Sequence, residues 1–112
     1  MNVYEEAHNL ARAIKDSNEF KEFDHWRAAV EQDEQLKQMI NSFEQLQLQM
    51  TAGQMNGQGL DPELMSRLQS MYTMLAAKPE AARYLEASMR FSLMMKDVGE
   101  ILADAVNIKL SL

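Results

Sequence analysis

Two Glu-x-x-His motifs carry the side chains of this sequence that are best suited to binding a metal for catalysis. Glu5 and His8 form the first motif, Glu22 and His25 form the second, and these are the only histidines in the chain. Helical bundles that hold two metal ions use two such motifs together with a glutamate from each of two further helices. Candidates for the further glutamates are Glu44, Glu86 and Glu100. On this pattern the protein would be a metal-dependent helical enzyme.

The predicted helices place these motifs on the faces opposite their apolar residues. At 100° per residue, the apolar stripe that starts at Val3 centres near 10°, whereas Glu5 and His8 fall at about 200° and 140°. His25 lies almost opposite the apolar face of its own helix. We therefore expect these side chains to face solvent, predict no metal site and no cofactor, and keep the metal-dependent enzyme as the alternative hypothesis.

No other constellation in the sequence predicts catalysis. The chain has no cysteine, which removes thiol nucleophiles, thiolate zinc sites and iron–sulfur ligation together. None of its serines lies in a G-x-S-x-G elbow. The glycine-rich stretch TAGQMNGQGLDPEL, residues 51–64, lacks the lysine of a phosphate-binding Walker loop and follows no strand. We interpret this stretch as a turn between two helices and predict that the protein is not an enzyme.

Helical spacing of apolar residues runs through nearly the whole chain, and strand alternation is nowhere sustained. Predicted N-caps are Asn2, Ser17 or Asn18, Asp33 and Asp61, because their side chains can accept a hydrogen bond from the first helical turn. Methionines at helical spacing are predicted to fill gaps in the core: Met39, Met50, Met71, Met89 and Met94. The sequence predicts an all-α fold, an antiparallel bundle or hairpin of about five helices, in a single domain over residues 1–112.

The C-terminal helix, predicted from about residue 80 to 108, carries the most regular pattern. Apolar residues seven apart form two interleaved sets, which together make a heptad seam. This helix would be about 43 Å long, whereas a compact chain of this length is about 34 Å across. We therefore expect an apolar overhang that a second copy covers, in a homodimer or higher oligomer. The predicted interface residues are Tyr84, Phe91, Met94, Val98, Ile101, Ala105 and Ile108. A second strip of Leu85, Met89, Leu102 and Val106 widens the apolar face.

Composition limits the other partners. The net charge is −6 and the sequence shows no clustered basic patch, so direct binding to nucleic acid is not expected. The longest uncharged run lies between Glu44 and Asp61 and is rich in glutamine and glycine, so it could not span a membrane. The first twenty residues are charged where a signal peptide would be apolar. We expect a cytoplasmic protein whose partners are itself and other proteins.

Several short stretches resemble one family of small helical bacterial proteins. They are Leu10, Ile14, SNEF (17–20), Asp33-Glu34, Phe43, QMNG (54–57) and LEASMRFSLMMKDVGEI (85–101). In order and spacing they resemble the YlbF/YmcA/YheA family, and the YheA-like branch most closely, over residues 3 to 108. The resemblance implies an all-helical fold that oligomerises through long helices, with no known catalytic residues.

The resemblance also implies a class of function. YlbF- and YmcA-like relatives are similar to adaptors that act with a third protein on ribonuclease Y, and so affect messenger-RNA turnover and development. Iron–sulfur binding attributed to that complex would need cysteines, which this chain lacks. We therefore expect a non-enzymatic helical interaction protein with an adaptor or regulatory role.

Overall fold

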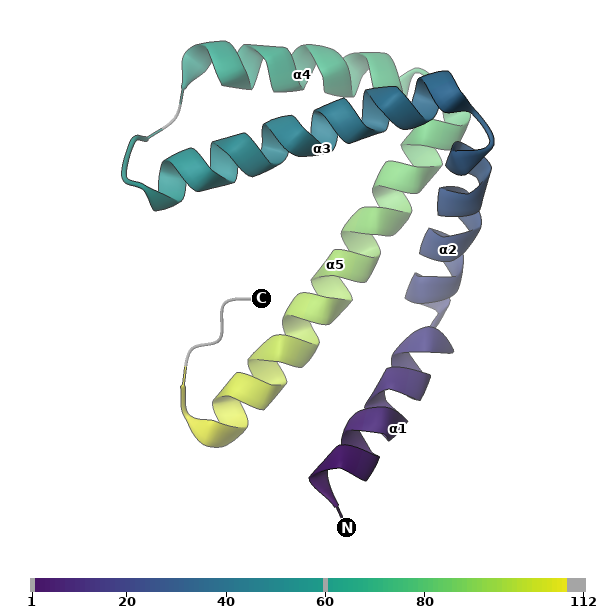
Figure 1. Ribbon diagram of the computed structural model, residues 1–112, viewed down its shortest axis with the longest axis vertical. Coiled ribbons are helices and arrows are strands. Elements are labelled where there is room, and N and C mark those ends of the chain that lie inside the picture. The colour runs from purple at the N-terminus through teal and green to yellow at the C-terminus, as the bar shows by residue number, and fades with distance from the viewer. Residues whose placement is uncertain (1, 60, 109–112) are drawn as a thin grey trace. The chain divides into compact units, whose positions relative to one another are not determined.

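The computed structural model describes residues 2–59 and 61–108, and over these residues it contains five α-helices and no strand (Figure 1). The helices are α1 (Val3–Lys15), α2 (Asn18–Glu31), α3 (Glu34–Met55), α4 (Pro62–Ala76) and α5 (Pro79–Val106). The predicted all-α fold class is confirmed. The chain divides into two compact units, Met1–Trp26 with Tyr84–Leu112 (unit 1) and Arg27–Arg83 (unit 2). A single domain over the whole chain stays a prediction.

The helices begin where side-chain chemistry predicts. Asn2, Ser17, Asp33 and Asp61 each accept a hydrogen bond from a backbone N–H in the first turn of α1, α2, α3 and α4, at 2.7 to 3.1 Å. Each cap satisfies a backbone donor that the helix itself leaves unpaired. Four helix starts are therefore determined locally, by one polar residue each.

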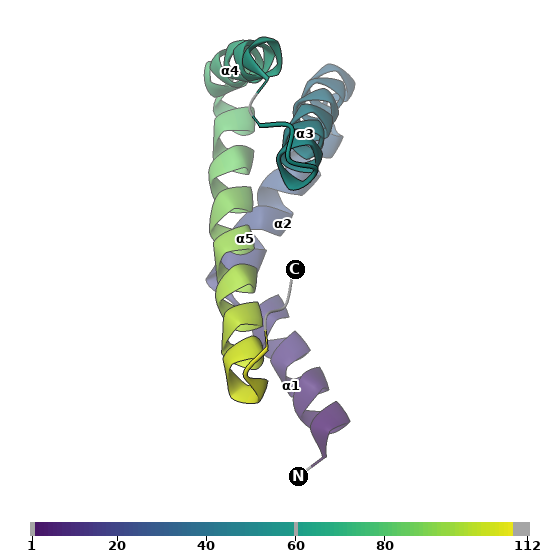
Figure 2. The same cartoon turned by 90° about the vertical axis from the view of Figure 1, so that its left-hand side faces the viewer.

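In unit 1, α2 runs antiparallel to α5 (Figures 1 and 2), and aromatic rings connect the two helices. Phe20 lies 5.6 Å from Phe91, and Phe23 lies 5.1 Å from Phe91 and 5.8 Å from Tyr84, between ring centroids. As the residue number rises along α2, the residue number of its partner on α5 falls, so the two helices run antiparallel. Such ring pairs stabilise by about 0.5–1.5 kcal/mol each beyond their burial, so this cluster attaches α2 to the first half of α5.

Unit 2 is built on an antiparallel hairpin of α3 and α4, which lie side by side. Only six residues separate the two helices, so α4 must return along α3. Its buried apolar side chains are Val30, Leu36, Ile40, Phe43, Leu46, Leu75 and Ala81. A pair of helices can bury only one stripe of each helix against the other. The other faces of α3 and α4 must therefore be covered by something else or meet solvent.

The glycine-rich stretch ends α3 and makes the turn, as interpreted from the sequence. Gly57 has a φ of 76° and Gly59 a φ of 72°. The N–H of Gln58 donates to the carbonyl of Gly53 at 3.0 Å, a bond that closes the last turn of a helix when the residue before it is left-handed. Glycine is favoured at residue 57 because L side chains rarely adopt this backbone conformation and are strained in it.

The corner between α2 and α3 is held by an ion pair. The ammonium of Lys37 lies 3.0 Å from a carboxylate oxygen of Glu31, the last residue of α2. The hydrogen bond to Glu31, with the charges of Glu31 and Glu34, raises the pKa of Lys37. Both side chains are exposed, so this pair contributes little to stability and only favours the observed direction of the chain between α2 and α3.

Two details of α5 differ from the sequence-based expectation. The helix ends at Val106 rather than near residue 108, because Asn107 adopts a φ of 57° and the N–H of Ile108 donates to the carbonyl of Ala103 at 3.1 Å. The prediction that Met89 fills the core is wrong, since 69% of this residue is exposed. Within the described residues, α5 is nevertheless one unbroken helix of 28 residues, about 42 Å long.

Candidate functional site

The first Glu-x-x-His motif lies on the exposed side of α1. Glu5 and His8 are both exposed, as the helical angles predict. Their neighbours on that side of the helix include Asn9 and Arg12, which form a side-chain hydrogen bond with each other. This part of α1 is a polar outer face.

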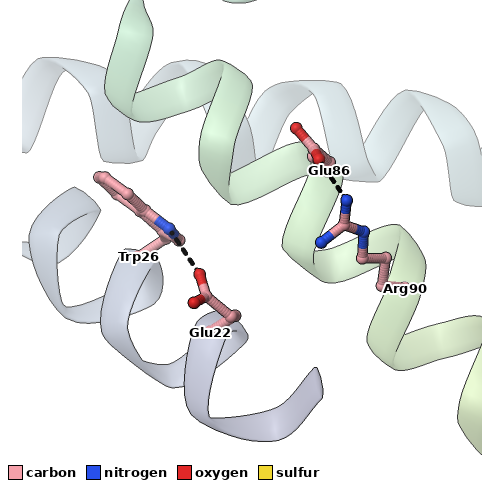
Figure 3. Close-up of polar contacts among 4 residues, drawn as sticks. All are labelled: Glu22, Trp26, Glu86 and Arg90. Atoms are coloured by element: carbon pink, nitrogen blue, oxygen red, sulfur yellow. Dashed lines mark hydrogen bonds and ion pairs between the residues drawn. The ribbon is translucent and has the colours of Figure 1, made fainter. Parts of the chain in front are cut away.

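The second motif is engaged in contacts within α2. The indole Nε1 of Trp26 donates a hydrogen bond to a carboxylate oxygen of Glu22 at 3.3 Å (Figure 3). The exposed ring of His25 lies edge-on to the Trp26 ring, with 4.8 Å between centroids. Among residues 2–59 and 61–108, no three or more histidine, aspartate or glutamate side chains gather where they could hold a metal ion. The arrangement therefore gives no support to the metal-dependent alternative.

The carboxylates considered as further ligands on α5 make short-range ion pairs. Glu86 lies 2.7 Å from the guanidinium of Arg90, one turn away, as Figure 3 shows. Glu100 lies 3.9 Å from the ammonium of Lys96. Pairs with this spacing on an exposed helix are worth a few tenths of a kcal/mol, so they are typical of a solvated helix face.

The seam on α5 divides into two halves with different surroundings. Tyr84 and Phe91, two of the seven predicted interface residues, contact α2 of the same chain. Met94 and Val98 are half-buried, whereas Ile101, Ala105 and Ile108 are exposed. The first half of the seam therefore packs within unit 1, and the second half meets solvent.

The exposed half forms one broad apolar surface at the end of α5. Ile101 is 67% exposed and Val106 is 62% exposed. The members of this terminal apolar surface are Ile101, Leu102, Ala105, Val106 and Ile108. The four members on α5 spread over an arc of about 140°, and Ile108 follows the end of the helix. Leu102 also lines a groove of about 510 Å³, together with Asn2 and with Val3, Glu6, Ala7 and Leu10 of α1. Glu100 lies on the other side of the helix, whereas Asp104 lies about 60° from Ile101 and borders the surface.

Sequence reasoning missed a second concave surface, in unit 2. A groove of about 640 Å³ runs between α3 and α4 and is lined by residues from both helices. Its signal in the sequence was the uncharged run between Glu44 and Asp61, which by itself shows only that the segment is neutral. The fold was needed to place this run beside α4.

These features define a class of protein: an all-helical chain with exposed apolar surfaces and, over the described residues, no cluster suited to a metal. None of its described helices is both long enough and apolar enough to cross a membrane. Comparison with known sequences then identifies the family. The chain belongs to the family described as "Control of competence regulator ComK, YlbF/YmcA", whose model matches residues 3–107.

Individual relatives agree with this assignment. The chain is 36% identical over 108 residues to a UPF0342 protein of Caldicellulosiruptor saccharolyticus, covering 96% of this chain and 90% of the relative. It is 32% identical over 111 residues to a UPF0342 protein of Clostridium tetani, covering 99% and 96%. A solved protein of unknown function (DUF964) from Bacillus stearothermophilus matches with a TM-score of 0.75, 21% identity, and coverage of 94% of this chain and 92% of that chain. At this identity the structural match shows the fold alone.

Proposed function

We propose that this protein is a non-enzymatic interaction protein of the adaptor or regulatory kind, which acts in the cytoplasm as a homodimer or higher oligomer. Its self-association uses the terminal apolar surface of α5. The observation that carries the proposal is the exposure of Ile101 and Val106 in the same two turns of one rigid helix. Contiguous apolar patches on soluble proteins usually mark interaction sites.

The exposed apolar side chains of this surface would stabilise a contact with a second copy. Covering a fully exposed large aliphatic side chain contributes about 1.5–3 kcal/mol. A two-fold interface uses each residue twice, and Ile101 and Val106 are 67% and 62% exposed, so these two residues together contribute about 4–8 kcal/mol to the gross interaction. Ala105 is small enough to let a second helix approach closely, while Leu102 and Ile108 extend the contact on either side.

The biological role is proposed from the family. Its description names control of a competence regulator, and the resemblance to YlbF- and YmcA-like adaptors connects such proteins with RNA turnover and development. We propose a role of this type, in which the helical chain joins other proteins and the reaction they affect is carried out elsewhere. We also propose membership of the YheA-like branch, on the QMNG stretch at residues 54–57.

The proposal is tested by placing one charge on the terminal surface. Ile101→Asp and Val106→Asp should each weaken self-association at least tenfold, because a carboxylate would have to be buried in an apolar contact. The matched control is Leu93→Asp: Leu93 is also on α5 and is 57% exposed, but it lies about 150° from the centre of the terminal surface. Sedimentation equilibrium gives the association constants, and circular dichroism checks that the helices remain.

Two results would contradict the proposal. Ile101→Asp and Val106→Asp could associate as tightly as the wild type, which would place the interface elsewhere. Alternatively, Leu93→Asp could dissociate the protein as strongly as the other two variants, which would mean that the terminal surface has no special part.

A further inference from the structure

The groove between α3 and α4 has an aromatic and aliphatic floor that the hairpin leaves partly uncovered. Phe43 is buried at its base, and the ring of Tyr72 lies 6.2 Å away, between centroids. Tyr72 remains 51% exposed, while Met50 and Leu68 are half-buried. These four side chains, two from each helix, line one continuous opening of about 640 Å³.

The α3 side of this groove has the spacing of a coiled-coil seam. Phe43, Gln47, Met50 and Gln54 follow one another at intervals of four, three and four residues, and all four line the groove. In heptad terms, Phe43 and Met50 occupy one core position, and Gln47 and Gln54 occupy the other. Such a seam receives side chains from a facing helix, and a polar residue at one of its core positions specifies which register and partner are accepted.

The polar part of the lining consists of neutral groups. Gln47, Gln54 and Gln69 supply amides, and the hydroxyl of Thr51 donates to the carbonyl of Gln47 at 3.0 Å. Among the residues that the structure describes, no lysine, arginine, aspartate, glutamate or histidine lines the groove. Residues 45–59 contain no charged side chain, in a chain where 25% of residues are charged. An exposed helix normally carries charge on its free face, so this neutrality indicates contact with another surface.

The absence of charge favours a second copy over a partner of opposite charge. The net charge of the chain is −6, so a basic partner would be recognised through carboxylates, and the groove has none. In a two-fold contact the same lining supplies both sides, so a lining charged with one sign would repel itself. An amide carries both a donor and an acceptor, so glutamine can pair with glutamine from an identical surface.

We propose that the α3–α4 groove is filled by the α3–α4 hairpin of a second copy of this chain, so that the two hairpins form a four-helix bundle. The facing glutamines form a polar layer within the bundle, between layers built from Phe43, Met50 and Tyr72. Two-fold pairing of helical hairpins is an established route to such a bundle. This surface belongs to unit 2 and does not depend on the terminal apolar surface of α5.

A charge-swap experiment tests the occupant directly. The double variants Gln47→Glu/Gln54→Glu and Gln47→Lys/Gln54→Lys are each prepared both in the wild type and with Ile101→Asp, which weakens the terminal surface. Each should self-associate at least tenfold more weakly than its parent, because like charges meet whichever residue faces which. An equimolar mixture of the two should recover association as a mixed complex, which native mass spectrometry identifies by mass. Only pairing between two copies gives this recovery.

The matched control uses Gln38 and Gln45, which are also seven residues apart and exposed but lie on the opposite face of α3. Charging them in the same way should leave association unchanged. A second readout avoids reliance on charge: because the chain has no cysteine, Gln54→Cys should be joined into dimers by a short bis-maleimide, and Gln45→Cys should not.

Three outcomes would overturn the proposal. They are unchanged association of the glutamate and lysine variants, failure of their mixture to recover a mixed complex, and equal cross-linking of Gln54→Cys and Gln45→Cys. A different result is expected if only the proposed α5 interface is wrong. Ile101→Asp then leaves the association constant unchanged, while the charge-swap variants still change it.

Discussion

The first prediction concerns Phe91, the residue through which the covered half of the α5 seam contacts α2. Its ring stacks on Phe23 at 5.1 Å with an angle of 5° between planes, and lies 5.6 Å from Phe20. Phe91→Ala removes two aromatic pairs, worth about 1–3 kcal/mol together. Truncating a fully buried phenylalanine costs about 3–5 kcal/mol, and Phe91 is only half-buried. We therefore expect a loss of about 3 kcal/mol in the free energy of unfolding.

The assay is urea unfolding followed by the fluorescence of Trp26, the only tryptophan, which lies on α2 within unit 1. Phe91→Leu keeps an apolar side chain but loses the ring pairs, so it should cost about 1–2 kcal/mol. Ile101→Ala removes an exposed side chain of the same helix and should change the unfolding free energy of the monomer by no more than about 0.5 kcal/mol. A loss below about 1 kcal/mol for Phe91→Ala, or an equal loss for Ile101→Ala, would refute the division of the seam into a covered half and a free half.

Three further predictions concern the turn, the corner and the histidines. Gly57→Ala should destabilise the protein by about 1 kcal/mol in thermal unfolding, because its φ of 76° strains a side chain; an unchanged melting temperature would contradict the left-handed turn. The hydrogen bond to Glu31 raises the pKa of Lys37 above its ordinary value of 10.5, so the contribution of this pair is complete below that pH and is lost as pH rises through the raised pKa. Wild-type stability should therefore fall more steeply above pH 10.5 than that of Glu31→Gln, and parallel curves would contradict the pairing. His8→Ala combined with His25→Ala should leave helix content, oligomer mass and bound metal as in the wild type, and a metal content that falls with this double variant would revive the metal-dependent alternative.

The helix starts and the α3–α4 turn could be predicted because short-range chemistry determines them. Asn2, Asp33 and Asp61 each cap the helix that follows within three residues, and Gly57 adopts the left-handed conformation that ends α3. The unbroken course of α5 was likewise readable from its heptads. The end of this helix was less predictable, because asparagine can either continue a helix or end it. Here Asn107 ends the helix, and the N–H of Ile108 donates a hydrogen bond to the carbonyl of Ala103.

The surroundings of each apolar stripe could not be predicted, because they depend on residues far away in the sequence. The heptads treat Tyr84 and Ile101 alike, yet one is buried and the other is exposed, because α2 lies along only part of α5. Periodicity likewise placed Met89 on a core stripe, yet 69% of this residue is exposed. The groove beside Gln47 required α4 to be placed next to α3, which composition alone does not do.

Self-association of the unaltered protein underlies both proposed interfaces, and sedimentation equilibrium over a range of micromolar concentrations measures it. We expect a mass that is an even multiple of the 12.8 kDa chain and that decreases on dilution. A mass of one chain at every concentration would rule out both interfaces, because the terminal apolar surface and the α3–α4 groove would then be left uncovered by a second copy.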